Sequence, residues 1–437
     1  MKNIGIGLIG FGTIGAGVAK ILLENDKAIS DRLGAELELK KIADLDVTTD
    51  RGITVPDGIL TTAVDEVIGN PEIDIVIELI GGYEPARTFV ERALKSRQSV
   101  VTANKALLAK FGNELFATAK ENGVDLYYEA SVAGGIPIIK TMREALAGNR
   151  INSVCGILNG TCNYILTKMG DEGADFAEVL KTAQELGYAE ADPTFDVEGI
   201  DTAHKLAILT SLAFATEIDF EKIHVEGISN IKPVDFAFAK EFGYKIKLLA
   251  IAKNEDGHIE ARVHPTMIPK EHMLAKIDDV FNAVFVNADA LGPSLYYGQG
   301  AGMMATASAV VGDLVDIARN INNDNLRRIP DLSFQEDQIK PGNYRPMDEI
   351  SSQYYIRFSA HDKTSVLSRI AGILGSHEIS IASVIQQGGG DGDTVTVPVV
   401  MQTHKASEKN LRSALNEIDQ LDIIAAPTAV IRMESDL

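Results

Sequence analysis

The stretch NIGIGLIGFGTIGAGVAKILL, residues 3–23, decides the fold of the first part of the chain. The apolar run from Asn3 to Ile9 predicts a short strand, and apolar residues at helical spacing follow from Ile14 to Leu23. Between them lies the motif Gly10-Phe-Gly-Thr-Ile-Gly15. A strand, a tight glycine turn and a helix start form the context in which this motif binds a dinucleotide.

The three glycines have separate roles in such a turn. Gly10 permits the turn, Gly12 lets the backbone approach a pyrophosphate, and Gly15 lets the helix lie close to the strand. The amino end of the helix then faces the phosphates. We therefore expect a cofactor site built by Gly10, Phe11, Gly12, Thr13, Ile14 and Gly15. A plain glycine turn is the alternative.

A second predicted strand, Glu36 to Ala43, ends in Asp44. A carboxylate there accepts hydrogen bonds from the adenosine ribose and repels a 2′-phosphate, which favours NAD over NADP. The interval from Gly15 is longer than the usual ~20 residues. A solvated acidic loop with Asp46 and Asp50 therefore stays open as the alternative.

Strands and helices then alternate. Further strands are predicted at 73–80, 99–102 and 124–128, with helices at 85–95 and 112–120. This alternation predicts a doubly wound parallel sheet, in which ligands bind beyond the carboxyl ends of the strands. Lys105 follows such an end, in Thr102-Ala-Asn-Lys105, and is either functional or an ordinary surface lysine at a helix start.

Composition narrows the classes of partner. The chain has 437 residues, a formal net charge of -21 and 24% charged residues, which suits two or three domains. Such a charge disfavours nucleic acid and anionic lipid as partners, so a small molecule is expected. No leader pattern or long apolar span is recognised, so we expect a cytoplasmic protein. Cys155 and Cys162 give neither a disulfide framework nor a zinc site and fit an apolar core.

The pattern changes after about residue 136. A strand at 151–158, an amphipathic helix at 176–186 and a hairpin of 248–253 with 258–263 predict a second domain with an antiparallel or mixed sheet. The glycine-rich segment 298–302 leads into a long helix through Arg319, which could return to the first domain.

The segment GYAEADPTFDVEGIDTAHK, residues 187–205, is crowded with carboxylates. We expect a helix from near Asp196 or Glu198 through Ala215, with Asp201 and Lys205 on one face. An exposed ion pair would be the plain interpretation. The apolar residues that follow indicate a buried helix instead. A lysine among carboxylates suits a small zwitterion, which suggests a dehydrogenase or reductase that acts on the side-chain alcohol of an amino acid.

Six motifs, in order, resemble the homoserine dehydrogenase family over nearly the whole chain: GFGTIG, TANKALLA, EASVAGGIPII, LNGTCNYIL, GYAEADPTFDVEGIDTAHKL and GAGMMATASAVVGDL. The resemblance implies NAD(P)-dependent interconversion of L-homoserine and L-aspartate 4-semialdehyde in the route to threonine, methionine and isoleucine.

The resemblance also implies roles for single residues. Lys205 would be the acid/base, with Lys105 beside nicotinamide and substrate. Glu190, Asp196 and Asp201 would hold the substrate amino group and orient the lysines, so Asp201 would share in catalysis. Gly160, Thr161 and Tyr188 would line the pocket, and Gly302 would contact the cofactor. In EASVAGGI, the Glu129 carboxylate and the carbonyls of Val132, Gly134 and Ile136 would coordinate sodium or potassium. A glycine-rich turn between domains is the alternative there.

The last part of the chain resembles an ACT domain, with a predicted βαββαβ order. Its elements are expected at 354–361, 365–377, 379–386, 395–402, 407–415 and 429–433. Many ACT domains have Pro-Gly after the first strand, where this chain has Thr364-Ser365. An amino-acid effector and a purely structural, oligomer-forming role therefore both stay open.

The expected fold class is α/β with three domains. They are a Rossmann-type dinucleotide-binding domain (1–135 plus about 303–325), an α+β substrate and dimerisation domain (136–302) and, after a linker (326–352), a ferredoxin-like ACT domain (353–437). A homodimer or homotetramer is expected. Two departures from the family matter here. Ala43 stands where many relatives have an arginine that meets a 2′-phosphate, which strengthens the prediction of NAD without excluding NADP. Ala305 stands where proline is usual and should alter only local backbone stiffness. The rival functions are a non-catalytic nucleotide and amino-acid sensor, and a dehydrogenase for another amino acid such as one forming saccharopine.

Overall fold

The computed structural model describes residues 2–386 and 396–435. Contacts divide the chain into two compact units. The first comprises Met1–Gly160, Asp201–Ile223 and Val280–Gly342, and the second Thr161–Ile200, His224–Asp279 and Asn343–Leu437. Each unit is built from segments that are far apart in the sequence.

The first unit contains a six-stranded sheet in the order β3-β2-β1-β4-β5-β6, parallel throughout. Its strands are β1 (Asn3–Ile9), β2 (Glu36–Ala43), β3 (Leu60–Thr61), β4 (Ile75–Glu78), β5 (Ser99–Thr102) and β6 (Leu126–Tyr127). Helices of this part are α1 (Thr13–Glu24), α2 (Asp26–Leu33), α3 (Ala86–Lys95) and α4 (Lys105–Asn122). The predicted doubly wound sheet is confirmed.

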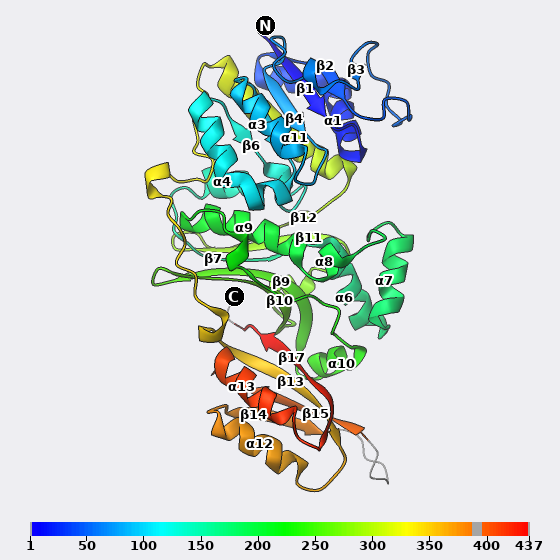
Figure 1. Ribbon diagram of the computed structural model, residues 1–437, viewed down its shortest axis with the longest axis vertical. Coiled ribbons are helices and arrows are strands. Elements are labelled where there is room, and N and C mark those ends of the chain that lie inside the picture. The colour runs from blue at the N-terminus through cyan, green and yellow to red at the C-terminus, as the bar shows by residue number, and fades with distance from the viewer. Residues whose placement is uncertain (1, 387–395, 436–437) are drawn as a thin grey trace. The chain divides into compact units, whose positions relative to one another are not determined.

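The long helix α11 (Met303–Asn322) packs on α1, although almost three hundred residues separate them in sequence (Figure 1). A Cβ added to Gly17 of α1 would lie 3.0 Å from Met303, so glycine permits this close approach. Val310 and Ile317 of α11 join Val18 and the β1 residue Leu8 in one buried apolar cluster. The segment predicted to return to the first domain therefore completes its core.

The first unit also holds an antiparallel sheet in the order β12-β11-β7. Its strands are β7 (Ile151–Ile157), β11 (Phe281–Ala288) and β12 (Gly292–Gln299). A short helix, α5 (Ile138–Lys140), precedes β7. Helix α9 (Ile200–Phe214) is buried at every position from Asp201 to Ala213, as its apolar residues predicted.

The helix expected from near Asp196 or Glu198 through Ala215 is present as α9, which begins near the second of these starts, and the start near Asp196 is wrong. The structure has α8 (Thr194–Val197), then Gly199 at φ +80°, then α9. A Cβ on Gly199 would meet Val225 and Val263 at 3.2 Å, so packing as well as backbone conformation requires glycine there. Asp196 and Asp201 consequently lie on separate helices.

The second unit begins with α6 (Gly160–Glu172) and α7 (Phe176–Glu185) and includes α8 and α10 (Pro233–Glu241). Strand β9 (Tyr244–Glu255) pairs antiparallel with β10 (His258–Pro269), in a hairpin longer than predicted, and β8 (His224–Val225) pairs with β10. Helices α2, α6 and α10 and strands β11 and β12 were not predicted from the sequence.

The carboxyl-terminal elements confirm the βαββαβ order. They are β13 (Ser351–His361), α12 (Val366–Ser376), β14 (Ile381–Gln386), β15 (Thr396–Thr403), the short β16 (Ala406–Ser407), α13 (Glu408–Ile418) and β17 (Ile424–Met433). Val395, the expected start of the third strand, lies outside the described residues. The sheet order is β17-β13-β15-β14, and β17 also pairs with β10, which joins this module to the β9–β10 hairpin.

Charged residues reinforce this junction within the second unit. Arg432 of β17 is 2% exposed and pairs with Glu226 at 2.8 Å and with Glu408 of α13. Asp235 of α10, fully buried, accepts hydrogen bonds from Arg357 of β13 at 2.6 Å and from Tyr355 at 2.9 Å. Buried ion pairs thus tie β17 to Glu226 and α13, and β13 to α10.

Candidate functional site

Asp201, at the start of α9, joins two lysines. Its Oδ2 lies 2.6 Å from Nζ of Lys205, one helical turn later, and its Oδ1 lies 3.3 Å from Nζ of Lys105. Lys105 is the first residue of α4, just beyond the carboxyl end of β5. The fold of the first unit thus brings together three residues from two predicted motifs.

Lys205 is held from a second side as well. Its Nζ donates to the carbonyl of Leu158 at 2.6 Å, and the Asn159 amide donates to Asp201 at 2.9 Å. Asn159 was not predicted as a site residue, although it belongs to the LNGT motif that carried the resemblance. An amide directly after an apolar strand was the available signal.

Electrostatics keep Asp201 ionised. Burial alone would raise the pKa of Asp201, but the charges of Lys205 and Lys105 and the hydrogen bonds from Lys205 and Asn159 together hold it well below its usual range. Burial lowers the pKa of the neighbouring His204 to about 4, and both lysine charges act in the same direction. The site therefore contains one carboxylate between two ammonium groups, next to a neutral imidazole.

The turn that presents Lys105 is fixed by a second buried carboxylate that sequence reasoning missed. Glu78, at the end of β4, accepts from the Thr102 hydroxyl at 2.7 Å and from the amide of Ile80 at 2.8 Å. Asn104 caps α4 by accepting from the Leu107 amide. A glutamate at the end of an apolar strand was the signal.

The glycine turn has the geometry that a dinucleotide needs. Gly10 has φ +100°, and a Cβ on Gly15 would lie 2.1 Å from the Gly10 carbonyl oxygen. A Cβ on Gly12, by contrast, would have no described atom within 4 Å. Close packing thus accounts for Gly10 and Gly15, whereas the space at Gly12 fits an approaching pyrophosphate.

Asp44 lies against this turn. Its Oδ2 accepts from the Phe11 amide at 2.5 Å and its Oδ1 from the Asp46 amide at 2.8 Å. Thr13 and Ile14 begin α1, and Gly302, at φ +118°, immediately precedes α11. Asp44 therefore has a structural role in holding the turn, beside the expected role with the ribose.

Glu129 is buried at the predicted cation loop. Its two carboxylate oxygens accept from the amides of Ile139 at 2.9 Å and Lys140 at 2.7 Å, and its own amide donates to Asp313. Burial raises the pKa of both Glu129 and Asp313, and the charge of Asp313 adds to the effect on Glu129. Within the described residues no group of three or more His, Cys, Asp or Glu side chains could hold a metal ion.

The backbone of this loop turns sharply at Gly134. Gly134 has φ +52°, and a Cβ there would lie 2.3 Å from the Gly300 carbonyl oxygen. The Ile136 carbonyl accepts from the Ile138 amide, and Val132 is buried. Oxygen donors of the kind that a hard monovalent cation prefers are present.

Four other predicted substrate residues belong to the second unit. The Thr161 hydroxyl donates to the Tyr188 carbonyl at 2.5 Å, and the Asp196 carbonyl accepts from the Cys162 thiol at 3.1 Å. Glu190 is exposed, and its carbonyl accepts from Gln184. Gly160, at the start of α6, belongs to the first unit and lies against Val280.

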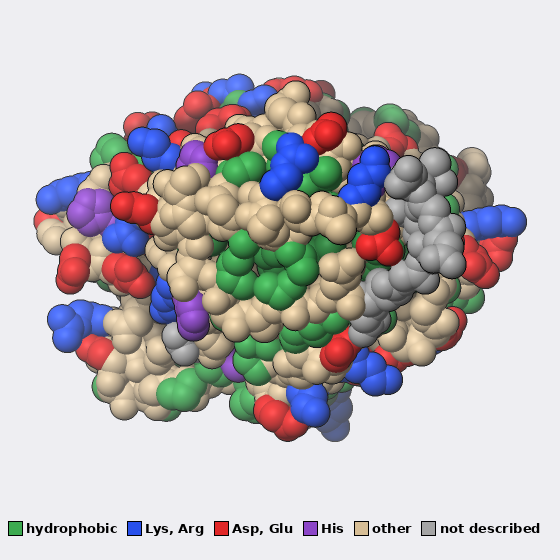
Figure 2. Space-filling model, turned by 90° about the horizontal axis from the view of Figure 1, so that it is seen from below, with side chains coloured by type: hydrophobic (Ala, Val, Ile, Leu, Met, Phe, Trp, Pro, Cys, Tyr) green, Lys and Arg blue, Asp and Glu red, His purple; other side chains and the backbone are tan. Residues whose placement is uncertain are grey.

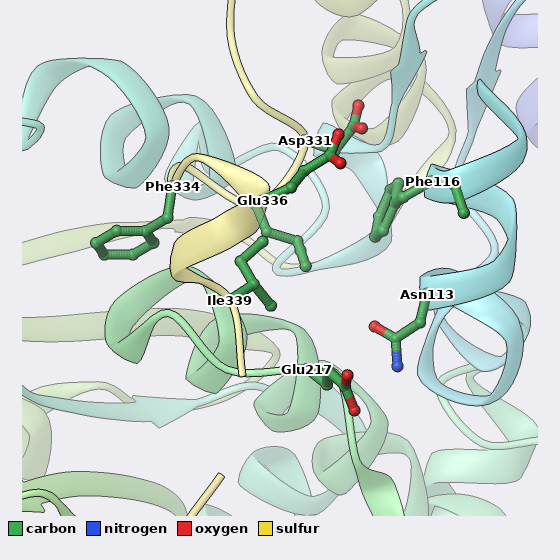
Figure 3. A pocket seen from close by; sticks show the side chains of 9 residues that line it. Asn113, Phe116, Glu217, Asp331, Phe334, Glu336 and Ile339 are labelled. Carbon is green, nitrogen blue, oxygen red and sulfur yellow. The ribbon is translucent and has the colours of Figure 1, made fainter. Parts of the chain in front are cut away.

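A separate hollow of about 200 Å³ also lies in the first unit (Figure 3). Asn113 and Phe116 of α4 point towards the segment that carries Glu336 and Ile339. Burial raises the pKa of Asp331, in its wall, to about 6. Its lining shares no residue with the candidates above.

A dinucleotide-type glycine turn, in the same unit as a buried aspartate that pairs with two lysines, is typical of a nicotinamide-dependent oxidoreductase. Family models agree in detail. Residues 10–129 match the homoserine dehydrogenase NAD-binding domain, residues 137–315 match homoserine dehydrogenase, and residues 354–422 match the ACT domain. The chain belongs to the homoserine dehydrogenase family.

Individual relatives extend this match over the full length. A homoserine dehydrogenase of Neisseria gonorrhoeae is 47% identical over 435 residues, which cover 100% of this chain and 99% of that protein. The crystal structure of a homoserine dehydrogenase from Thiobacillus denitrificans has a TM-score of 0.93 at 47% identity and covers 100% and 99% of the two chains. A hyperthermophilic archaeal homoserine dehydrogenase in complex with NADPH has a TM-score of 0.62 at 27% identity, over 74% of this chain and 100% of that one.

Proposed function

We propose that this chain interconverts L-homoserine and L-aspartate 4-semialdehyde with NAD or NADP, in the route to threonine, methionine and isoleucine. One observation carries the proposal: the buried Asp201 carboxylate joins Lys105 and Lys205 beyond the carboxyl end of β5. A non-catalytic sensor would need neither lysine in this arrangement.

Lys205 is the proposed acid/base. An ammonium has three donors. Among the described residues, two of the Lys205 donors bond to the Leu158 carbonyl and the Asp201 carboxylate. The third donor remains for the C4 oxygen of the substrate. In the oxidation direction, neutral Lys205 takes the hydroxyl proton; in reduction, its ammonium returns a proton to the aldehyde oxygen. A bound nicotinamide would supply the hydride chemistry at C4.

Asp201 and Lys105 are proposed to hold this geometry. Asp201 fixes the Nζ of Lys205 through an ion pair within one helical turn. Lys105, whose side chain is 37% exposed, can contact nicotinamide and substrate while it stays within reach of Asp201. The two ammonium groups favour the ionised form of Asp201. The Asp201 carboxylate in turn holds both ammonium groups in place.

The substrate amino group is proposed to pair with Glu190, Asp196 and Asp201, and Gly160, Thr161 and Tyr188 are proposed to line the pocket. The contact between Thr161 and the Tyr188 carbonyl supports a common role for these two residues.

The proposed cofactor residues are Gly10, Phe11, Gly12, Thr13, Ile14, Gly15, Asp44, Lys105 and Gly302. NAD is slightly favoured, because Asp44 is held beside the glycine turn by two backbone amides and its charge would repel a 2′-phosphate. NADPH bound to the archaeal relative supports NADP as a second cofactor.

A sodium or potassium ion at the loop of Glu129, Val132, Gly134 and Ile136 is part of the proposal. Two buried carboxylates, Glu129 and Asp313, support it, since a cation would stabilise their charged forms. No chemical step depends on this ion.

The ACT domain is proposed to bind an amino-acid effector or to join subunits in a homodimer or homotetramer. Leu367 and Val384 of this domain are about 40% exposed. Figure 2 shows apolar side chains gathered in the middle of one face, with charged side chains around them. Among the described residues, β14 pairs with β15 alone, so its other edge is available to a second copy.

The test is homoserine-dependent reduction of NAD and, separately, of NADP, with potassium and sodium each supplied. Activity with homoserine that exceeds activity with serine or threonine supports the proposal, and the ratio of kcat/KM values for the two cofactors tests the role of Asp44. If the protein is folded but inactive under all these conditions, the enzyme hypothesis fails and the sensor hypothesis takes its place. The domain boundaries given above stay a prediction.

A further inference from the structure

A pocket of about 350 Å³ in the second unit has no part in the proposed reaction. Helices α6 and α10, strand β9 and the segments that follow β10 line it. A volume in this range suits a small organic molecule. None of the described lining residues is among the proposed cofactor, substrate or catalytic residues.

Two lysines of β9 form the inner part of the pocket. Lys247 is 2% exposed and donates to Asn163 at 3.0 Å, to Asp278 at 2.9 Å and to the Ile277 carbonyl. Lys245 pairs with the same Asp278 carboxylate at 3.2 Å. Burial lowers the pKa of Lys247, against the opposing charge of Asp278. One carboxylate thus serves two ammonium groups.

Two further lysines stand at the outer part. Lys240 of α10 and Lys270 after β10 are exposed, and no ion pair is found for either within residues 2–386 and 396–435. Asp171 is the second carboxylate of the lining. Four ammonium groups therefore face two carboxylates, an excess of positive charge in a chain whose net charge is -21.

The remaining wall is apolar. The Phe236 ring packs against α6 at Gly170, where an added Cβ would lie 3.1 Å from the ring. Leu166 and Ile246 complete this wall, and Tyr244 lies beside them. A bound molecule would therefore meet cationic groups on one side and apolar surface on the other.

We propose that this pocket binds a small organic dianion, a phosphate monoester or a dicarboxylate with an apolar body. Two negative charges match the excess of two ammonium groups, and the apolar body covers Phe236 and Leu166. The overall negative charge of the chain excludes a polyanion, because a nucleic acid or an anionic membrane would be repelled by the surface around the pocket.

The test uses phenyl phosphate as the phosphate monoester, succinate as the dicarboxylate, and inorganic phosphate as an anion without an apolar body. Binding to the full-length protein is measured by isothermal titration calorimetry at constant ionic strength. The variant Lys240→Gln/Lys270→Gln removes the outer lysines, and Lys181→Gln/Lys276→Gln is a charge-matched control at exposed positions outside the pocket.

The expected result is binding of phenyl phosphate, succinate or both to the wild type, with a dissociation constant that rises at least about tenfold in the pocket variant and stays unchanged in the control. Since like charges repel, the pocket variant without ligand should also have a higher Tm than the wild type. No binding at about 10 mM, equal loss in both variants, or binding no tighter than that of inorganic phosphate would overturn the proposal. The test needs no catalytic activity, so it is independent of the proposed reaction.

Discussion

At the scale of single residues, the site depends on a few side chains whose charge and position follow from their neighbours. Asp201 has two ammonium groups and one amide around it, which is why a carboxylate that is 4% exposed remains charged. Lys205 and Lys105 could be predicted from their motifs. Asn159 and Glu78 were missed, because the signal for each was only a single polar residue at the end of an apolar strand, and their partners lie far away in sequence.

Gly12→Ala separates a ligand requirement from a packing requirement. A Cβ there meets no described atom within 4 Å, so the free energy of unfolding should change by less than about 0.5 kcal/mol. NAD binding should weaken at least about tenfold, because the methyl group occupies the space of the pyrophosphate. Gly148→Ala, also in open space, is the control. Unchanged NAD affinity in Gly12→Ala would remove the glycine turn from the cofactor site.

His204 should make stability depend on pH. Its pKa in the folded state is lowered to about 4, whereas in the unfolded chain it is about 6.5. The neutral imidazole therefore contributes its full stabilisation at pH values above about 6.5. That contribution is lost as the pH falls from about 6.5 towards 4. The unfolding free energy of wild type minus that of His204→Asn should therefore decrease over this range. The exposed His258→Asn serves as control, and a difference that is constant with pH would contradict the assignment.

At the scale of helices and strands, local patterns predicted the parallel sheet, the glycine turn and the βαββαβ module. They failed where a special backbone conformation interrupts a pattern. Gly199 separates α8 from α9 although the surrounding residues favour one continuous helix. The strands β11 and β12 went unrecognised although they form a hairpin with each other. Strand β11 is buried at most positions, so it lacks the alternation that marks a half-buried strand.

Ser365 shows such a conformation in the ACT domain. It precedes α12 at φ +71°, which is the left-handed region that glycine adopts without strain. Ser365→Gly should raise the unfolding free energy by up to about 1 kcal/mol. Ser368→Gly, inside the same helix, should lower it by about 0.5 kcal/mol. Thermal unfolding of both variants checks the pair, and destabilisation by Ser365→Gly would show that its side chain is needed.

At the scale of the whole molecule, each unit is assembled from distant segments. Helix α11 completes the core of the sheet that begins the chain, and β17 pairs with β10. Sequence motifs indicated the first association. Nothing in the periodicity of β17 indicated its pairing with β10, because strand pairing depends on both strands and not on the pattern of one alone. No helix in the described ranges is long and apolar enough to cross a membrane.

The buried ion pair between Arg357 of the ACT domain and Asp235 of α10 should contribute strongly to the stability of the second unit. Arg357→Met leaves the fully buried Asp235 without its guanidinium partner, which should cost about 3–5 kcal/mol. Arg369→Met breaks an exposed pair with Asp422 in the same domain and should cost about 1 kcal/mol or less. Urea unfolding measures both. Similar costs would mean that the buried pair contributes no more than a surface one.

The most direct test of the central claim is the rate of homoserine oxidation by Lys205→Ala, with Lys181→Ala as an exposed-lysine control. If Lys205 exchanges the proton at the C4 oxygen, kcat should fall by about 10²–10⁴-fold while the variant stays folded and binds NAD as the wild type does. A folded Lys205→Ala protein with nearly wild-type kcat would contradict the account.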